Sequence, residues 1–271
     1  MLQYSKANAK LAGLYDVPEL QEWLVSECGR FTAEVYSLDL LSGWSCPFAE
    51  KCKSKVYELA GQFTKSGNVK KKLVDGRKTE FRCFSASQEV LLPNVYDRRK
   101  NNFDLLKACK TKEEMTELMQ RSLPRNAGIV RQHVGGDFFN ETYFEAWLDL
   151  AEQNPNVLFY AYTKSLFFWA RNVKRVESLD NVVLTASRGG SQDWMIEGYG
   201  FRESVVVYSE EQADDMELVI DHDDSHAAVP NWSKNDFALL IHGVQPAGSE
   251  AGQAVSALGG KGSYGKKALA V

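Results

Sequence analysis

Short apolar runs alternate with polar or glycine-rich clusters through the second half of the chain, between Gly128 and Gly243. Each run predicts a strand, and the runs lie at 129–130, 157–162, 182–186, 218–220 and 237–241, with 205–208 as a sixth candidate. Amphipathic segments between them predict helices at 143–153, 166–173, 193–198 and 210–216. Strands that alternate with helices of this length indicate parallel β–α–β units.

We therefore expect an α/β fold, a parallel (β/α) barrel that is partial or complete, with an N-terminal helical and loop elaboration. Residues 1–247 form a single domain in this interpretation, and 31–110 within it carries the cysteines and a basic loop. The tail at 248–271 is rich in Gly, Ala and Ser and is predicted to be flexible. Further predictions are helices at 8–30, 55–63 and 87–121 (with breaks near 93 and after 109) and strands at 31–41 and 80–84.

Net charge is −4, so no overall positive field directs the chain to nucleic acid or to a membrane. Positive charge is local, however, since residues 61–110 carry twelve Lys/Arg against five Asp/Glu. Such a run is typical of a solvated face; the alternative is a basic lip at 65–78 that binds a nucleotide or nucleic acid. With neither a signal peptide nor a membrane-spanning apolar stretch in the sequence, we expect a cytoplasmic protein without a membrane partner.

Three of the five cysteines lie in loop contexts. Cys46 and Cys52 are separated by five residues in a turn-rich segment, and Cys83 follows 31 residues later. Three loop thiolates beside a barrel could hold an iron–sulfur cluster with one iron open, or zinc with a fourth ligand such as histidine. The spacing matches none of the short metal motifs, and the alternative is three buried thiols that act as small hydrophobes. Cys28 and Cys109 lie in helical contexts and are predicted to pack.

Polar residues follow the predicted strands, where parallel α/β proteins hold their chemistry. His133 and Asp137 flank Gly135-Gly136, which lets a backbone or ligand approach closely. Asp137 could orient His133 or bind a ligand amine; the alternative is a tight turn in which Asp137 caps the next helix.

Later strand ends add further candidates. Lys164 and Arg188 could hold a carboxylate or phosphate at the barrel mouth. Thr163, Ser187 and His242 complete the predicted lining. The densest metal-ligand-type cluster is 221–226, with Asp221, His222 and His226, and its alternative interpretation is an acidic, solvated loop.

Four segments carry a resemblance to known proteins: 42–47 (SGWSCP), 81–89 (FRCFSASQE), 133–139 (HVGGDFF) and 159–165 (FYAYTKS). Together they resemble a bacteriophage family called gene product eighty-eight, over roughly residues 30–250. The cysteines and the polar strand ends also resemble a distant radical-SAM-type partial barrel, although the C-x3-C-x2-C loop usual there is not present in the sequence. The resemblance implies a [4Fe-4S] cluster on Cys46, Cys52 and Cys83, with S-adenosylmethionine as a candidate co-substrate.

Three functions remain open from the sequence. The first is an iron–sulfur protein, a radical-type enzyme that modifies a nucleotide or nucleic acid, with His133, Asp137, Lys164 and Arg188 in its pocket. The second is a metal-dependent hydrolase or nuclease that uses His133, Asp221, His222 and His226. The third is a non-enzymatic phage or virion binding protein, whose strand-end polar groups would be scattered or satisfied internally.

Overall fold

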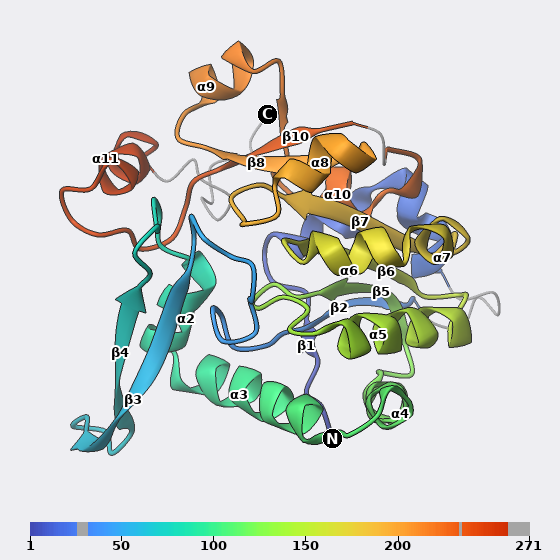
Figure 1. Cartoon of the computed structure of the whole chain (residues 1–271), viewed down its shortest axis with the longest axis horizontal. Helices are drawn as coiled ribbons and strands as arrows, with labels where there is room; N and C mark the ends of the chain where they lie inside the picture. The colour runs from blue at the N-terminus through green and yellow to red at the C-terminus, as the bar shows by residue number, and fades with distance from the viewer. Residues whose placement is uncertain (26–31, 233–234, 260–271) are drawn as a thin grey trace.

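The computed structural model describes residues 1–25, 32–232 and 235–259. Its centre is one eight-stranded sheet, in which every pair of neighbours is parallel except the first (Figure 1). In spatial order the strands are β1 (Ser5–Lys6), β2 (Glu34–Leu38), β5 (Ala127–Gln132), β6 (Leu158–Thr163), β7 (Val182–Ser187), β8 (Glu203–Val207), β10 (Phe237–Leu240) and β9 (Val219–Ile220). The expected α/β fold with a mostly parallel sheet is confirmed. Within the described ranges the two edge strands do not pair with each other, so no closed barrel is seen.

Helices cover both faces of this sheet. On one side lie α3 (Pro93–Ala108), α4 (Lys112–Ser122), α5 (Glu141–Gln153), α6 (Leu166–Arg171), α7 (Val173–Glu177) and α8 (Trp194–Tyr199). On the other lie η1 (Leu11–Asp16), η2 (Pro18–Leu20), α1 (Gln21–Leu24), α10 (Ser225–Ala228) and η3 (Pro230–Trp232). The central strands β5, β6 and β7 are buried on both faces, which explains why they are apolar runs without alternation.

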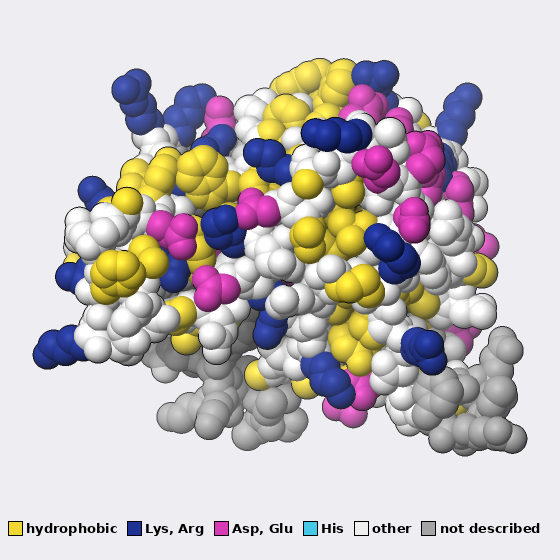
Figure 2. All heavy atoms as spheres, turned by 90° about the horizontal axis from the view of Figure 1, so that it is seen from below, with side chains coloured by type: hydrophobic (Ala, Val, Ile, Leu, Met, Phe, Trp, Pro, Cys, Tyr) yellow, Lys and Arg dark blue, Asp and Glu magenta, His cyan; other side chains and the backbone are white. Residues whose placement is uncertain are grey.

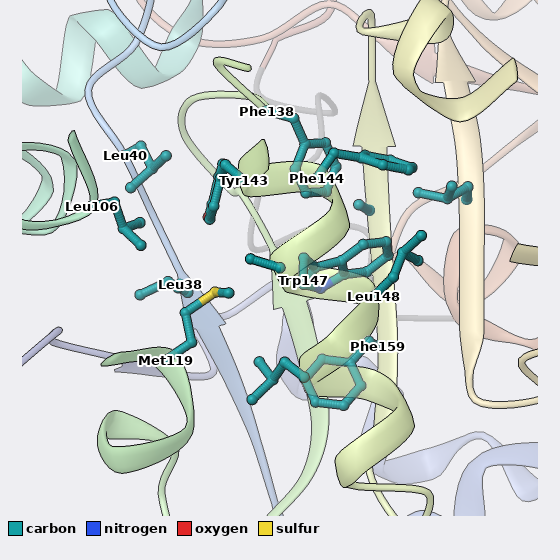
Figure 3. Close-up of a cluster of buried hydrophobic side chains, with 14 of the residues drawn as sticks. Leu38, Leu40, Leu106, Met119, Phe138, Tyr143, Phe144, Trp147, Leu148 and Phe159 are labelled. Carbon is teal, nitrogen blue, oxygen red and sulfur yellow. The ribbon is translucent and has the colours of Figure 1, made fainter. Parts of the chain in front are cut away.

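The larger core lies between the sheet and α5 (Figure 3). Trp147, Phe144 and Tyr143 on the inner side of α5 are fully buried, and they pack with Phe138 and with Phe159 of β6. The sequence starts this helix at Asn140, whose side chain accepts a hydrogen bond from the Tyr143 backbone N–H. This core fixes the segment between β5 and α5, which carries the polar strand end at 133–137.

A separate two-stranded hairpin, β3 (Ser54–Phe63) and β4 (Val69–Asp75), projects from one side of the sheet (Figure 1). The helix expected at 55–63 is therefore wrong. Side chains in the first half of β3 alternate between the two faces of the ribbon: Val56 is buried, whereas Tyr57 is exposed. Pairing with β4 around a turn at 64–68 satisfies the backbone and outweighs local helix propensity.

Other helical predictions hold in part. The expected helix at 87–121 with its two breaks corresponds to α2 (Phe84–Leu91), α3 and α4. Of the helix expected at 8–30, the described part forms η1, η2 and α1 instead of a single helix, and residues 26–30 lie outside the described part. In the tail, α11 (Glu250–Ala257) is helical, because Ser249 caps it by accepting from the Gly252 N–H and Ala251 is buried. The flexibility predicted for 248–271 stays a prediction, and residues 260–271 lie outside the described part.

The remaining helix, α9 (Glu210–Asp215), connects β8 to β9. Of the helices that the structure describes, none combines the length and the apolar character needed to cross a bilayer.

Candidate functional site

A cavity of about 170 Å³ opens where the carboxyl ends of the central strands meet the cysteine-bearing segments. Eleven of the twelve residues predicted for the site line it: Cys46, Cys52, Cys83, His133, Gly135, Gly136, Asp137, Thr163, Lys164, Ser187 and His242. The carboxyl ends of parallel strands lie at the same edge of a sheet, and the residues that follow these strands therefore converge. The cysteines need a separate explanation.

The loop that carries Cys46 and Cys52 follows β2 and is anchored to the end of β7. Backbone N–H groups of Glu50 and Lys51 donate to the Gly189 carbonyl at 3.2 and 3.0 Å, and Ala49 pairs with Gly190. Gly189 has φ +105°, a conformation that suits glycine. This contact holds the loop over the open edge of the sheet.

Cys83 reaches the same cavity because the hairpin closes at its base. The Gly76 N–H donates to the Lys53 carbonyl at 2.7 Å, and the Phe81 N–H donates to the Lys51 carbonyl at 3.1 Å. The Cys83 N–H then donates to Ser54 Oγ at 3.2 Å. The residues between Cys52 and Cys83 therefore form a hairpin whose two ends meet, and both cysteines lie at its base.

The thiols influence one another electrostatically. Burial, assisted by the charge of Cys52, raises the pKa of Cys83 to about 12. Burial also raises the pKa of Cys46 well above its usual range, and Asp137, Cys83 and Cys52 add to that effect. Both thiols are protonated at neutral pH, so a metal or cluster would have to displace their protons.

A single-ion site is not assembled in this arrangement. Among the residues that the structure describes, no group of three or more His, Cys, Asp or Glu side chains could hold a metal ion. Cys109, predicted to pack, lies at the end of α3 against the core and outside the cavity lining. Cys28 lies outside the described residues.

Asp137 ties the end of β5 to the end of β6. One of its oxygens accepts from Thr163 Oγ1 and from the Phe138 N–H, both at 2.7 Å, and the other accepts from the Lys164 N–H at 2.9 Å. Burial raises its pKa to about 6, although these donors oppose the shift. A carboxylate offers about four acceptor positions, so one remains on a side chain that faces the cavity.

The two glycines before Asp137 are required by packing. A Cβ on Gly135 would lie 2.1 Å from Ser85 Oγ and 2.8 Å from Arg99 Cζ. Gly136 has φ +95°, and a Cβ there would lie 2.6 Å from Ser45 Oγ. The glycine pair thus lets β5 end directly against α2, α3 and the cysteine loop.

His133 ends β5 with φ +70°, a left-handed conformation that is uncommon outside glycine. Its Nε2 lies 3.0 Å from the Tyr143 hydroxyl, while the buried Nδ1 has no hydrogen-bond partner in the described structure. Burial and the charge of Arg131 lower the pKa of His133 to about 3, so the ring is neutral. A neutral, partly unpaired imidazole on a cavity wall is able to bind a ligand proton or donor atom.

Lys164 and Arg188 lie differently. Lys164 Nζ donates to the Ser187 carbonyl, the Ser187 hydroxyl and the Arg188 carbonyl at 2.7, 2.9 and 2.8 Å, so its three donors join β6 to β7. Arg188 is the predicted site residue that is not in the cavity lining, and its guanidinium pairs with Glu203 and Glu197 on the outer side. Both residues build the strand ends instead of presenting charge to the cavity.

A buried ion network beneath the cavity escaped the sequence prediction. Asp224 accepts from Arg131, from Lys10 Nζ at 2.7 Å and from the hydroxyls of Tyr160 and Tyr162. Burial alone would raise the pKa of Asp224, but Arg131 and Lys10 hold it at about 2. Two cations that line the cavity thus share one carboxylate. In the sequence, the hint of this network was Arg131, a charged residue that lies within a predicted strand.

The 221–226 cluster lies beside this network. The Tyr162 hydroxyl donates to buried Asp221 at 3.1 Å, and His226 Nδ1 lies 3.7 Å from the same carboxylate. His222 is exposed. None of the three belongs to the cavity lining that contains His133. The structure therefore does not bring together the four residues of the hydrolase hypothesis.

His242, after β10, lines the cavity next to Phe84, with the ring centroids 4.5 Å apart. Burial, together with the charges of Lys10 and Arg131, lowers the pKa of His242 to about 3. It therefore contributes a second neutral imidazole to the lining.

Comparisons with known proteins give one match. The model of the Gene product 88 family matches residues 2–257, whereas curated proteins and solved structures give no significant match. The matched range includes every residue of the cavity lining. Because it spans nearly all of the 271 residues, the chain belongs to the Gene product 88 family.

Proposed function

We propose that this protein is an iron–sulfur enzyme of the radical-SAM type, in which Cys46, Cys52 and Cys83 hold one [4Fe-4S] cluster. One observation carries the proposal: the three thiols come from two segments 31 residues apart and line the same cavity as the polar strand ends. Buried thiols that serve only as small hydrophobes have no reason to gather beside polar groups at the functional edge of a parallel sheet.

The arrangement suits a cluster better than a single ion. A zinc ion must contact all its ligands at once, with Zn–S distances of about 2.3 Å. A four-iron cluster spreads its cysteines over different iron atoms, so its ligands stand further apart. The three thiols share one cavity and form no single-ion group within the described residues, so a centre with several irons is the form of metal binding that we propose.

The rest of the lining suits a small zwitterion such as S-adenosylmethionine. Asp137 keeps one acceptor for an amine and is close enough to Cys46 to raise the pKa of that thiol. Lys10 and Arg131, which line the cavity, are side chains of the kind that bind a carboxylate or a phosphate. When bound, the cluster would supply single electrons for radical chemistry on the co-substrate.

The topology supports a partial (β/α) barrel as the scaffold. From β2 through β5, β6 and β7 to β8, spatial order follows chain order, without the reversal that marks doubly wound sheets. In a barrel of this kind the functional groups come from the ends of several strands, as they do in this cavity. We propose a nucleotide or nucleic acid as the substrate, because lysines gather in the hairpin that follows Cys52.

The test is cleavage of S-adenosylmethionine by protein loaded with iron and sulfide in the absence of oxygen and reduced with dithionite. Formation of 5′-deoxyadenosine is measured by chromatography. Wild type and Cys109→Ser should form it, whereas Cys83→Ser should not. Failure of the loaded wild type, or equal formation by Cys83→Ser, would contradict the proposed enzyme and leave the binding-protein alternative, which the internal bonds of Lys164 favour.

A further inference from the structure

The β3–β4 hairpin has two unlike faces. Directly opposite residues of an antiparallel pair point to the same side, and sides alternate along each strand. The inner face carries the Val56–Leu73 pair, with Val56 only 1% exposed, and Lys71, whose Nζ lies 4.6 Å from the ring centroid of Tyr96 in α3. The inner face therefore packs on the helices next to it.

The outer face is exposed and combines aromatic rings with lysines. It carries the pairs Tyr57–Lys72 and Lys55–Val74. Trp44, from the cysteine loop, packs edge-on against Tyr57 with ring centroids 5.0 Å apart, and Lys55 Nζ lies 4.3 Å from the Trp44 ring. Trp44 and Tyr57 are each 40% exposed. Two aromatic rings are thus partly exposed to solvent, with Lys55 beside one and Lys72 paired across from the other.

The positive charge of the hairpin is not neutralised. At its base, three cations have a carboxylate partner: Lys51 with Glu80, Lys78 with Glu50, and Arg82 with Asp75. Along the ribbon, by contrast, five lysines form no ion pair with any described residue, namely Lys55, Lys65, Lys70, Lys71 and Lys72. Figure 2 shows basic and apolar side chains next to each other at the end of the molecule where the hairpin lies.

We propose that this outer face, with Trp44, Tyr57, Lys55, Lys70 and Lys72, binds single-stranded nucleic acid. Aromatic rings give unpaired bases a surface on which to stack, and lysines neutralise phosphates; together these are the contacts of sequence-tolerant single-strand binding. A duplex hides the faces of its bases, so it would use the lysines but not the rings. An acidic protein would likewise leave the rings unused.

The position of Trp44 links this surface to the cavity. Trp44 lies two residues before Cys46, and its indole N–H donates to the Val56 carbonyl at 3.0 Å, which joins the cysteine loop to the ribbon. A strand bound on the outer face would therefore pass beside the cavity. The binding itself depends only on the hairpin and can be measured without iron, so its failure is distinct from failure of the proposed enzyme.

The experiment measures fluorescence anisotropy of a labelled oligo-dT of roughly 15 nucleotides, within the range of known single-strand sites, as wild-type protein is added at several salt concentrations. We expect saturable binding that weakens with salt. Tyr57→Ala should weaken it by roughly 5- to 150-fold, the loss expected for one stacked base, while Tyr57→Phe should bind like wild type. Lys70→Gln with Lys72→Gln should reduce the salt slope by about 1.4, the value for two phosphates on a single strand.

A matched control replaces Lys110 and Lys174, two exposed lysines on other faces, with Gln. This control should retain the wild-type affinity and salt slope. The proposal is overturned if the control loses as much as the hairpin variants, if Tyr57→Ala binds like wild type, or if a duplex of the same length binds more tightly than the single strand. Each variant is first checked for an unchanged melting temperature.

Discussion

The cavity and the outer face of the hairpin carry charge in opposite ways. Lys164 and Asp137 in the cavity lining are buried, as is Asp224 beneath it, and several protein groups form hydrogen bonds or ion pairs with each of them. On the ribbon, lysines such as Lys70 and Lys72 stand in solvent without a described carboxylate partner. Charge in the cavity therefore fixes geometry, whereas charge on the ribbon is available to a partner.

The backbone nevertheless connects the two regions directly. The hairpin begins just after Cys52 and the chain comes back to its base before Cys83, so the hydrogen bonds that close the base also hold two proposed cluster ligands near each other. Substitutions in the cavity should therefore affect folding strongly. Those on the ribbon should affect binding and leave folding almost unchanged.

The largest effect is expected at Asp224. Asp224→Asn would leave Lys10 and Arg131 as buried cations without their shared anion, and breaking a buried pair costs about 3–5 kcal/mol. Urea unfolding measures this loss. The control Glu117→Gln removes an exposed pair with Arg121 and should cause no measurable change. Equal stability of both variants would show that the network does not hold the cavity floor.

A smaller loss is expected at Gly135. In Gly135→Ala the new methyl group would meet Ser85 Oγ and Arg99, and such overpacking costs about 1–3 kcal/mol. Gly198 in α8 has nothing within 4 Å of a Cβ, so Gly198→Ala should be neutral or stabilise by up to about 1 kcal/mol. Denaturant midpoints of the two variants give the comparison, and a neutral Gly135→Ala would refute the close contact.

The pH dependence of stability should change at His133. Its pKa is about 3 in the folded protein and about 6.5 when unfolded, so the unfolded chain binds a proton that the native state does not. The contribution of His133 to the free energy of unfolding is therefore full above about pH 6.5 and is lost as the pH falls toward 3. His133→Asn, which tolerates positive φ, should reduce the slope of stability between about pH 4 and pH 6 by about 1.4 kcal/mol per pH unit. An unchanged slope would contradict the buried, neutral ring.

The smallest effect on folding is expected on the ribbon. Lys70→Gln with Lys72→Gln should change the free energy of unfolding by no more than about 0.5 kcal/mol, because both side chains are exposed. The same urea titration measures it. A large loss of stability would mean that these lysines serve the fold, and the contrast between the two regions would fail.

The sequence located the strand ends well because hydrophobic runs and parallel topology together bring polar residues to one edge of a sheet. His133, Asp137, Thr163, Ser187 and His242 line one cavity for that reason. Three cysteines could be singled out by their loop contexts. Their proximity could not be derived, since it depends on the closed base of a hairpin whose first strand has the propensity of a short helix.

Side-chain direction was also beyond the sequence. Arg188 follows β7 as Lys164 follows β6, yet the side chain of Arg188 turns outward to Glu197 and Glu203. Lys10 and Asp224 come from opposite ends of the chain and meet only through folding. Long-range ion pairs of this kind leave no local pattern in the sequence. The indication of the buried network was therefore a single charged residue inside a strand, Arg131.

The most direct test of the central claim, that Cys46, Cys52 and Cys83 share one cluster, is the iron and sulfide content of protein purified and reconstituted without oxygen. Wild type and Cys109→Ser should each hold about four iron and four sulfide per chain. Each single Ser variant of the three cavity cysteines should lose most of both. Wild-type protein without sulfide-bearing iron, or a Cys109→Ser variant that loses as much as Cys83→Ser, would contradict the account.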